Sequence, residues 1–428
     1  MNKKALLGSF FLCLQIHAHA DVATPQEACS TPPIAITSVR VFDGLIVIPS
    51  ATVVIQCATI SRIVETGRSP DLTADTIIVE GRGKTLLPGL IDAHVHTFRR
   101  EMLERSLDFG VTTVFDMGSV NKSFVKTIKN EDLERIATDR ADLLSAVLWV
   151  TAPGSHGTQF GEVPTLAEPE DASAFVAQRA ADGADYIKII YDNFKMFDRP
   201  VPTLSKQTLF AVVDAAHEQG MMAVVHSRDV DAYADVVESG ADGLVHVVVD
   251  EVPGGLLIEA LKRNNMFVSP NLSLARHDGL RLINDPFIGP LLTKKEIENL
   301  GQWRALQREG GDQVEYDALM AFHRAGVMIL AGSDSPNGGT TVGASIHLEM
   351  ELIVEAGMTP IEALRTATSN PAKAFGLEDR GRIAEGLKAD LLLVNGKPDQ
   401  NITDTRNLDM IWKAGSMHEV STRTVVLH

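Results

Sequence analysis

The first candidate site lies in the segment Leu87-Pro-Gly-Leu-Ile-Asp-Ala-His-Val-His96, where one valine separates two histidines. In a β-strand, alternate residues point to the same face, so His94 and His96 would present both imidazoles to one side. Two neutral imidazoles at this spacing can bind one divalent metal ion. The pair alone is a weak indication, because two unconnected histidines can also flank a valine.

Three further candidate ligands follow apolar runs later in the chain. His226 ends the run Val224-Val-His, His246 ends Leu244-Val-His, and Asp334 ends Leu330-Ala-Gly-Ser-Asp. If these runs are parallel strands of a barrel, their carboxyl ends meet at one rim, which is where barrel active sites lie. These side chains are therefore predicted to converge with the two earlier histidines on one metal site.

Lys188 is unusual because it lies inside the apolar run Asp185-Tyr-Ile-Lys-Ile-Ile190. Burying a lone ammonium is costly, and a protonated lysine has no lone pair with which to bind a metal. One interpretation is that CO2 converts the amine to a carbamate, an anionic oxygen ligand that bridges two metal ions. The other is an ion pair inside the barrel. Together with the histidines, the pattern favours the carbamate.

Eight apolar runs would supply the elements that position these residues. They alternate with stretches that carry apolar residues at helical spacing, which is the pattern of repeated βα units. The runs are 86–92, 111–116, 143–150, 186–190, 222–225, 243–245, 266–269 and 327–331. They predict an α/β fold with a TIM-type (β/α)8 barrel. A doubly wound open sheet is the alternative, but no Gly-x-Gly-x-x-Gly or P-loop motif follows any run.

The regions before and after these runs are predicted to be β-rich. Residues 34–42 alternate between apolar and polar types, and residues 389–395 form a similar short run. Because the ends of a barrel chain lie near one another, both regions are expected to pack together as a small β-sandwich domain. The predicted organisation is a signal peptide over 1–20, the barrel over 85–377, and two parts of the β-domain over 21–84 and 378–428.

Residues 1–20 have the pattern of a secretory signal peptide. Lys3 and Lys4 precede a short apolar run, and Ala18-His-Ala20 fits the small-x-small cleavage pattern. The alternative is a buried N-terminal helix. No later segment reaches about eighteen uninterrupted apolar residues, so no membrane contact is expected once the signal is removed. We therefore expect a secreted protein, with the periplasm as its destination.

The composition limits the kinds of molecule that the protein is expected to bind. The chain has 428 residues, a formal net charge of −17 and 45% hydrophobic residues, which is typical of a globular protein. The acidic balance argues against nucleic acid and anionic membranes as partners, because phosphate contacts need clustered Lys and Arg. A homo-oligomer is left open. After export to an oxidising compartment, a disulfide between Cys29 and Cys57 is a hypothesis, since spacing alone does not fix its geometry.

In combination, these motifs resemble the amidohydrolase superfamily over about residues 33 to 425. The resemblance is carried by Leu87–His96, Gly183-Ala-Asp-Tyr-Ile-Lys188, the later ligands, and the segment Gly357-Met-Thr-Pro-Ile-Glu-Ala-Leu-Arg-Thr-Ala-Thr-Ser-Asn-Pro-Ala-Lys-Ala-Phe-Gly376. Lys188 makes the chain similar to the binuclear-zinc, prolidase-like and aryl-dipeptidase-like members that have a carboxylated lysine. Imidazolonepropionase is also similar, but it is mononuclear and lacks that lysine.

The resemblance implies a site with two divalent metal ions, with zinc as the expected metal. His94, His96 and Asp334 would hold the more buried ion, and His226 and His246 would hold the other. A carbamate on Lys188, formed from CO2, would bridge the two ions. A hydroxide between the metals would then be the nucleophile, and Asp334 would move its proton to the leaving amine.

Candidates for contacts with a small-molecule substrate lie on loops near the predicted rim. His156, in Gly154-Ser-His-Gly157, is placed to donate a hydrogen bond to the developing oxyanion, although related members tend to have Gly-Gly-His-Gly here and a loop histidine in water is the alternative. Arg228 could bind a substrate carboxylate, and Tyr191 could add a hydroxyl group. Both could equally be structural rim residues, and Asn271 is a further candidate.

Together these features predict a metal-dependent amidohydrolase that cleaves a dipeptide such as Xaa-Pro or an N-acyl amino acid. A mononuclear cyclic-amide hydrolase or deaminase, similar to imidazolonepropionase, is one alternative. A lactone or phosphotriester hydrolase is another, since the same nucleophile attacks those centres. A non-catalytic exported binding protein belongs to a different class, but such a protein usually loses ligands, and this chain retains them all.

Overall fold

The structure is a computed structural model, and it describes residues 31–65, 68, 70–195, 200–276, 278–302 and 311–419. The predicted signal peptide and Cys29 lie outside these residues. Cys57 is disulfide-bonded, and its pairing with Cys29 stays a prediction. In the described part of the chain, none of the helices combines the length and the apolar character needed to cross a membrane.

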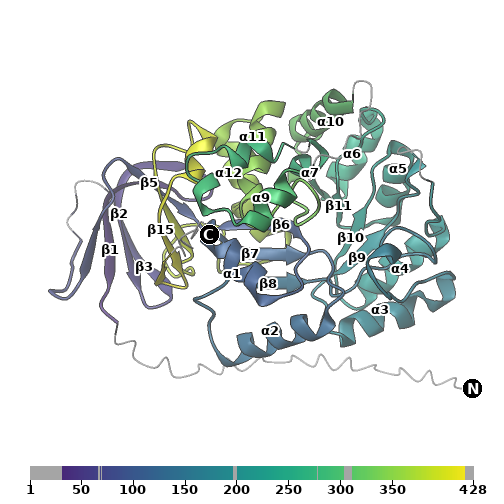
Figure 1. The fold of residues 1–428 in the computed structure, drawn as a ribbon, viewed down its shortest axis with the longest axis horizontal. Coiled ribbons are helices and arrows are strands. Elements are labelled where there is room, and N and C mark those ends of the chain that lie inside the picture. The colour runs from purple at the N-terminus through teal and green to yellow at the C-terminus, as the bar shows by residue number, and fades with distance from the viewer. Residues whose placement is uncertain are drawn as a thin grey trace, which may run out of the picture. The chain divides into compact units, whose positions relative to one another are not determined.

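Segments from both ends of the chain form one hydrogen-bonded sheet (Figure 1). Its strand order is β16-β15-β14-β5-β1-β2-β3, and β4 pairs with β1. The strands are β1 (Ile34–Phe42), β2 (Val47–Gln56), β3 (Thr59–Glu65), β4 (Ile77–Glu80), β5 (Lys84–Pro88), β14 (Leu391–Asn395), β15 (Leu408–Lys413) and β16 (Ser416–His418). β14 joins the two ends by pairing antiparallel with β5. Alternate residues such as Ile36, Val53, Leu391 and Trp412 are buried in a core of its own.

The predicted run 86–92 is divided between this sheet and the central strands. Its first part belongs to β5, and a new strand, β6, begins at Leu90. Pro88 has no N–H to donate to a ladder, and Gly89 packs against Thr112, where an added Cβ would come within 2.2 Å of the Thr112 Oγ1. The chain therefore changes sheets at Pro88-Gly89, which the apolar pattern alone did not reveal.

Eight strands that pair in parallel with their neighbours make the centre of the fold. They are β6 (Leu90–Val95), β7 (Val111–Asp116), β8 (Asp142–Ser145), β9 (Ile187–Ile190), β10 (Ala223–His226), β11 (Gly243–Val245), β12 (Phe267–Ser269) and β13 (Met328–Ile329). Their ladders form a three-stranded sheet, β6-β7-β8, and a five-stranded sheet, β13-β12-β11-β10-β9. This arrangement is of the TIM-barrel type, but the ladder is interrupted at two places.

Isolated parallel bridges cross both interruptions. Val150 pairs with Ile189 of β9, and Val95 of β6 pairs with Ser335, which follows β13. The run 143–150 was expected to be one strand, but β8 ends at Ser145, and Val147 has a positive φ of 59° that is incompatible with extended backbone. Val150 returns to a position in which it pairs with Ile189, so the two sheets meet here through a single bridge.

Helices follow most of these strands and cover their outer side; α3, α4 and α5 lie outside β9–β11 (Figure 1). The α-helices are α1 (Arg100–Asp108), α2 (Lys122–Glu134), α3 (Ala172–Ala181), α4 (Lys206–Glu218), α5 (Val230–Ser239), α6 (Gly255–Arg263), α7 (Leu272–Arg276), α8 (Leu280–Ile283), α9 (Lys294–Leu300), α10 (Gly311–Ala325), α11 (Ser345–Ala356), α12 (Pro360–Thr366) and α13 (Ser369–Ala374). Short 3₁₀ turns are η1 (Thr158–Phe160), η2 (Pro169–Asp171), η4 (Gly289–Leu291) and η5 (Ile402–Arg406). Side chains cap several helix starts; Asp229, for example, accepts from the Ala232 N–H at the start of α5.

The carboxyl ends of the central strands carry the predicted ligands. His94 lies near the end of β6, Lys188 in β9, and His226 is the last residue of β10. His246 follows β11 directly, and Asp334 follows β13 after a short turn. Because neighbouring strands are parallel, these ends lie at the same side of the fold, as the sequence predicted.

Candidate metal centre

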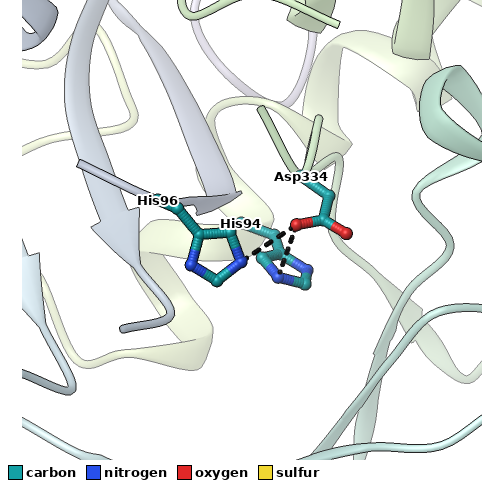
Figure 2. A group of neighbouring side chains, drawn as sticks. All are labelled: His94, His96 and Asp334. Atoms are coloured by element: carbon teal, nitrogen blue, oxygen red, sulfur yellow. Dashed lines mark ion pairs between the residues drawn. The ribbon is translucent and has the colours of Figure 1, made fainter. Parts of the chain in front are cut away.

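His94, His96 and Asp334 come together at the carboxyl ends of β6 and β13 (Figure 2). The His94 Nε2 lies 3.3 Å from the Asp334 Oδ1, and the His96 Nε2 lies 3.0 Å from the same oxygen. One ligand atom from each residue lies within 4.8 Å of the other two. Two imidazole nitrogens and a carboxylate oxygen at this separation fit a divalent cation such as zinc.

The electrostatics of this group favour cation binding. Burial would raise the pKa of Asp334, but the charges of His94 and His96 and a hydrogen bond from His96 outweigh it and hold that pKa well below its usual range. Burial lowers the pKa of His94 well below its usual value. Burial would also lower the pKa of His96, but its hydrogen bond and charge interaction with Asp334 outweigh burial and raise it. The site therefore offers an ionised carboxylate and a neutral His94, and a metal ion would displace the proton of His96.

The second ring nitrogens of both histidines are held by acceptors. The Asn271 Oδ1 lies 3.1 Å from the His94 Nδ1 and also accepts from the His246 N–H, while the Asn271 Nδ2 donates to the Gly332 carbonyl. The His96 Nδ1 donates to the Gly118 carbonyl at 2.9 Å. Each Nδ1 therefore carries a proton, and each Nε2 points to Asp334, the position from which it would bind a metal ion.

Asn271 was one of the candidates for a substrate contact, but its partners belong to the metal centre. It is 1% exposed, and its φ of 55° turns its side chain back under the site. The carboxylate of Glu349 on α11 accepts from the Leu272 and Ser273 N–H groups and fixes the chain directly after it. An asparagine shortly after a predicted strand was the only sign of this role in the sequence, because the left-handed backbone that asparagine tolerates appears only in the structure.

His226, His246 and Lys188 adjoin the first group. The rings of His226 and His246 are 4.3 Å apart, and the His246 Nε2 lies 3.6 Å from the Asp334 Oδ2. Burial lowers the pKa of both histidines well below the usual value, so both imidazoles are neutral. The structure thus brings the predicted ligands into one cluster, with Asp334 between its two parts.

Lys188 is a buried amine that lacks a hydrogen-bond partner among the described residues. It is 3% exposed, and burial lowers its pKa to about 7. A partnerless polar atom at this depth is costly unless another group occupies the site in the working protein. Lys188 interacts electrostatically with His94, His226, His246 and Asp334, so the residues fit a group that binds Lys188 beside these ligands.

Asp192 is a residue of this cluster that the sequence analysis missed. Its Oδ2 lies 3.3 Å from the His226 Nε2, and it is 3% exposed. It follows Lys188 by four residues and lies two residues beyond the end of β9. A carboxylate at this position on a barrel rim was the signal that could have identified it.

His156, Arg228 and Tyr191 lie close to the cluster but in different settings. The His156 ring stacks on Phe194 at 4.5 Å and is 5.3 Å from His226, and burial lowers its pKa to about 4. The Arg228 guanidinium lies over the Phe194 ring at 5.6 Å, and its charge helps to lower the pKa of His156. Tyr191 is nearly buried, and its hydroxyl donates to Asp235 on α5. Their roles toward a substrate stay predictions.

Residues 85–418, well over half of the chain, match the sequence profile of the Amidohydrolase family. The chain belongs to this family. It is therefore a hydrolase, and a metal centre of histidines and an aspartate at the carboxyl ends of parallel strands is what the family's use of metal ions leads us to expect.

Curated relatives and solved structures agree with this assignment. The chain is 26% identical over 361 residues to the imidazolonepropionase of Geobacillus kaustophilus, covering 77% of this chain and 78% of the relative. It is 23% identical over 352 residues to the dihydroorotase of Endomicrobium trichonymphae, covering 75% and 81%. The crystal structure of a Xaa-Pro dipeptidase with bound methionine in its active site aligns with a TM-score of 0.73 at 22% identity, over 90% of this chain and 100% of that one. At this identity the likeness to the dipeptidase shows the fold alone.

Proposed function

We propose that this amidohydrolase cleaves the amide bond of a small substrate with a free carboxylate, either a dipeptide such as Xaa-Pro or an N-acyl amino acid. The observation that carries the proposal is Lys188, a buried amine that has no hydrogen-bond partner among the described residues and adjoins two sets of imidazole ligands. The nearby guanidinium of Arg228 supports a carboxylate on the substrate, since its planar donors match that group. The solved dipeptidase with a bound amino acid is in accord with this choice.

The proposed cofactor is a pair of divalent ions, most simply zinc. His94, His96 and Asp334 would hold one ion, His226 and His246 the other, and a carbamate on Lys188 would bridge them. To form it, the unprotonated Lys188 Nζ attacks CO2, a C=O electron pair moves to oxygen, and the nitrogen releases a proton. When bound, the ions would supply Lewis acidity and make water nucleophilic near neutral pH.

The protein's own residues would carry the proton and orient the substrate. The ionised Asp334 would accept a proton from the attacking water and release it to the leaving nitrogen. His156 would donate a hydrogen bond to the carbonyl oxygen as negative charge develops there. Arg228 would bind the substrate carboxylate. Phe194 would pack between the His156 ring and the Arg228 guanidinium.

A substrate screen tests this proposal. Wild-type protein is incubated with N-acyl amino acids, Xaa-Pro dipeptides and the matching carboxamides, with Asp334→Asn as the control for the site. We expect the acids to be cleaved, the carboxamides to be about 10- to 100-fold poorer, and this preference to disappear in Arg228→Met. We also expect Lys188→Ala to lose turnover and short carboxylic acids to restore part of it. Equal cleavage of acids and carboxamides would contradict the role of Arg228, and full activity of Lys188→Ala would contradict the two-metal site.

A mononuclear cyclic-amide hydrolase is the second candidate. The group His94, His96 and Asp334 is sufficient for one ion by itself, and one of the relatives is an imidazolonepropionase. An unmodified Lys188 together with cleavage of cyclic amides would favour it. Turnover of lactones or phosphotriesters, but of no amide, would instead favour a lactone or phosphotriester hydrolase that uses the same site.

Architecture and export complete the proposal. We propose that the eight central strands act as a closed barrel over 85–377, supported by the bridges at both interruptions, and that the two end regions pack as a sandwich-like domain. Export to the periplasm rests on the pattern of residues 1–20. Sequencing of the mature N-terminus tests it: a start at Asp21 is expected, and a retained Met1 in a cytoplasmic fraction would contradict it.

A further inference from the structure

The loop that carries His156 holds the ring through a neighbouring glutamine. The loop lies between β8 and α3 and includes the turn η1. The Gln159 Nε2 lies 3.0 Å from the His156 Nδ1, and the Gln159 Oε1 accepts from the Gly157 N–H at 2.7 Å. The side-chain amide of Gln159 therefore spans from the backbone of the loop to the histidine ring.

The chemistry of the two bonds fixes which atom donates. A backbone N–H can only donate, so the amide group facing Gly157 must be the oxygen. The other end of the amide is then the NH2 group, which has hydrogens and no lone pair to offer. The His156 Nδ1 must accept from it, and a neutral imidazole that accepts at Nδ1 carries its proton on Nε2.

We infer that Gln159 is a positioning residue that holds His156 in the Nε2–H tautomer. His156 then presents a hydrogen-bond donor from Nε2 and not a lone pair that would bind a metal. His94 and His96 are held in the opposite way, because their Nδ1 atoms donate to acceptors and their Nε2 atoms point to Asp334. The value of this donor for catalysis rests on the proposed function, in which His156 contacts the substrate carbonyl.

The rest of the loop is secured without Gln159. The Thr151 Oγ1 donates to the His156 carbonyl, and the Thr158 Oγ1 donates to the Ser155 carbonyl, both at 2.7 Å. Gly157 has a φ of +99°, and an added Cβ would come within 2.3 Å of the Trp149 Nε1. The ring also stacks on Phe194. Replacing Gln159 by methionine, which has a similar length, should therefore free the tautomer without displacing the loop.

Nitrogen NMR of histidine reads the tautomer directly and needs no substrate. The full protein is labelled with 15N-histidine, and the His156 signals are identified by their loss in His156→Gln. We expect a pyridine-like Nδ1 and a protonated Nε2 in the wild type, a mixture of tautomers in Gln159→Met, and wild-type signals in the control Thr158→Val. A protonated Nδ1 in the wild type, or unchanged signals in Gln159→Met, would overturn the inference whatever the enzyme's substrate proves to be.

A double-mutant cycle then tests the catalytic consequence with the substrate found by the screen. Gln159→Met should lower kcat about tenfold with KM nearly unchanged, because only the transition state needs the donor. In the His156→Gln background the same change should have no further effect. Metal content should be equal in all four proteins. Equal losses in both backgrounds would show that Gln159 supports the loop and not the tautomer.

Discussion

At the scale of single residues, the ring orientation of His94 and of His96 is set by the group that its Nδ1 contacts. His94 and His96 are separated by a single valine, yet one Nδ1 faces the Asn271 side chain and the other faces the Gly118 backbone. Such outer partners orient metal ligands and raise their affinity. Of these two partners, the Asn271 side chain can be removed by mutation, whereas the Gly118 backbone carbonyl cannot.

Asn271→Leu should weaken binding of the more buried metal ion by about 10- to 100-fold, because His94 loses the acceptor that fixes its Nδ1 proton. Asn271→Asp keeps the acceptor for His94 but loses the donor to the Gly332 carbonyl, so it should retain more of the affinity than Asn271→Leu does. Zinc titration against a competing chelator measures both. Asn264→Leu is the matched control, since Asn264 ends α6 and its Nδ2 donates to the Val237 carbonyl on α5, outside the ligand-bearing strand ends. Equal affinity in wild type and Asn271→Leu would refute this role.

The residue types at the site were predictable, but their partners were not. Strand geometry predicted that six side chains would converge, because each lies within or at the end of an apolar run. They are His94, His96, Lys188, His226, His246 and Asp334. Asn271, Asp192 and Gln159 act through hydrogen bonds to ring nitrogens. Such bonds depend on loop conformation over a few ångströms, which no spacing rule encodes.

At the scale of elements, the site depends on how closely β13 approaches β6. Gly332 follows β13. A Cβ added to this glycine would lie 2.7 Å from the His94 Cβ and 2.5 Å from the Ser269 Oγ. Only glycine leaves room for both strands here. The run 327–331 located this strand in the sequence, but its observed extent is Met328–Ile329, because the following turn is shaped by these contacts and not by apolar pattern.

Gly332→Ala should displace His94 and so reduce both stability and metal affinity. The overpacking cost is about 1–3 kcal/mol, and the shift of His94 relative to Asp334 should lower zinc affinity at least tenfold. Urea denaturation of the metal-free protein and zinc titration measure the two effects. Gly254→Ala is the control, since nothing lies within 4 Å of the added Cβ and the φ there is −65°. Normal zinc affinity in Gly332→Ala would show that the close approach is not needed.

At the scale of the whole described unit, a buried charge cluster joins the end sheet to the central strands. Asp142 begins β8, and its Oδ2 lies 2.5 Å from the Lys388 Nζ and 2.9 Å from the Lys413 Nζ, next to β14 and at the end of β15. Lys413 is fully buried. Burial would raise the pKa of Asp142, but the charges of Lys413, Lys388 and Arg380 outweigh it and hold that pKa well below its usual range.

Asp142→Asn should destabilise the protein by about 3 kcal/mol at neutral pH, because it leaves buried lysines short of a counter-charge. Since the folded state depresses the pKa of Asp142, its contribution is present above the unfolded pKa of about 4 and is lost as the pH falls below it. Urea midpoints between pH 7 and 3 should therefore fall more steeply for wild type than for the variant. Asp409→Asn removes a partly exposed pair with Lys84 and should cost under about 1 kcal/mol. A similarly small cost for Asp142→Asn would contradict this account.

The architecture at this scale was largely predictable, because repeated βα units and β-rich ends leave few alternatives. The position at which the chain leaves one sheet for the other was not. Pro88 and Gly89 mark it, but the apolar run continues across them, and burial on both sides hides the change. The interruption after Ser145 has the same cause, since the apolar residues continue while the backbone leaves the strand.

We propose a two-metal site bridged by a modified Lys188, and the metal content per chain is the sharpest test of that proposal. Protein purified with zinc and bicarbonate and without chelators is measured by metal analysis and native mass, in parallel with Lys188→Met. We expect about two ions per chain and a CO2 adduct in the wild type, and about one ion in the variant. An unmodified lysine with the same metal content in both proteins would contradict it.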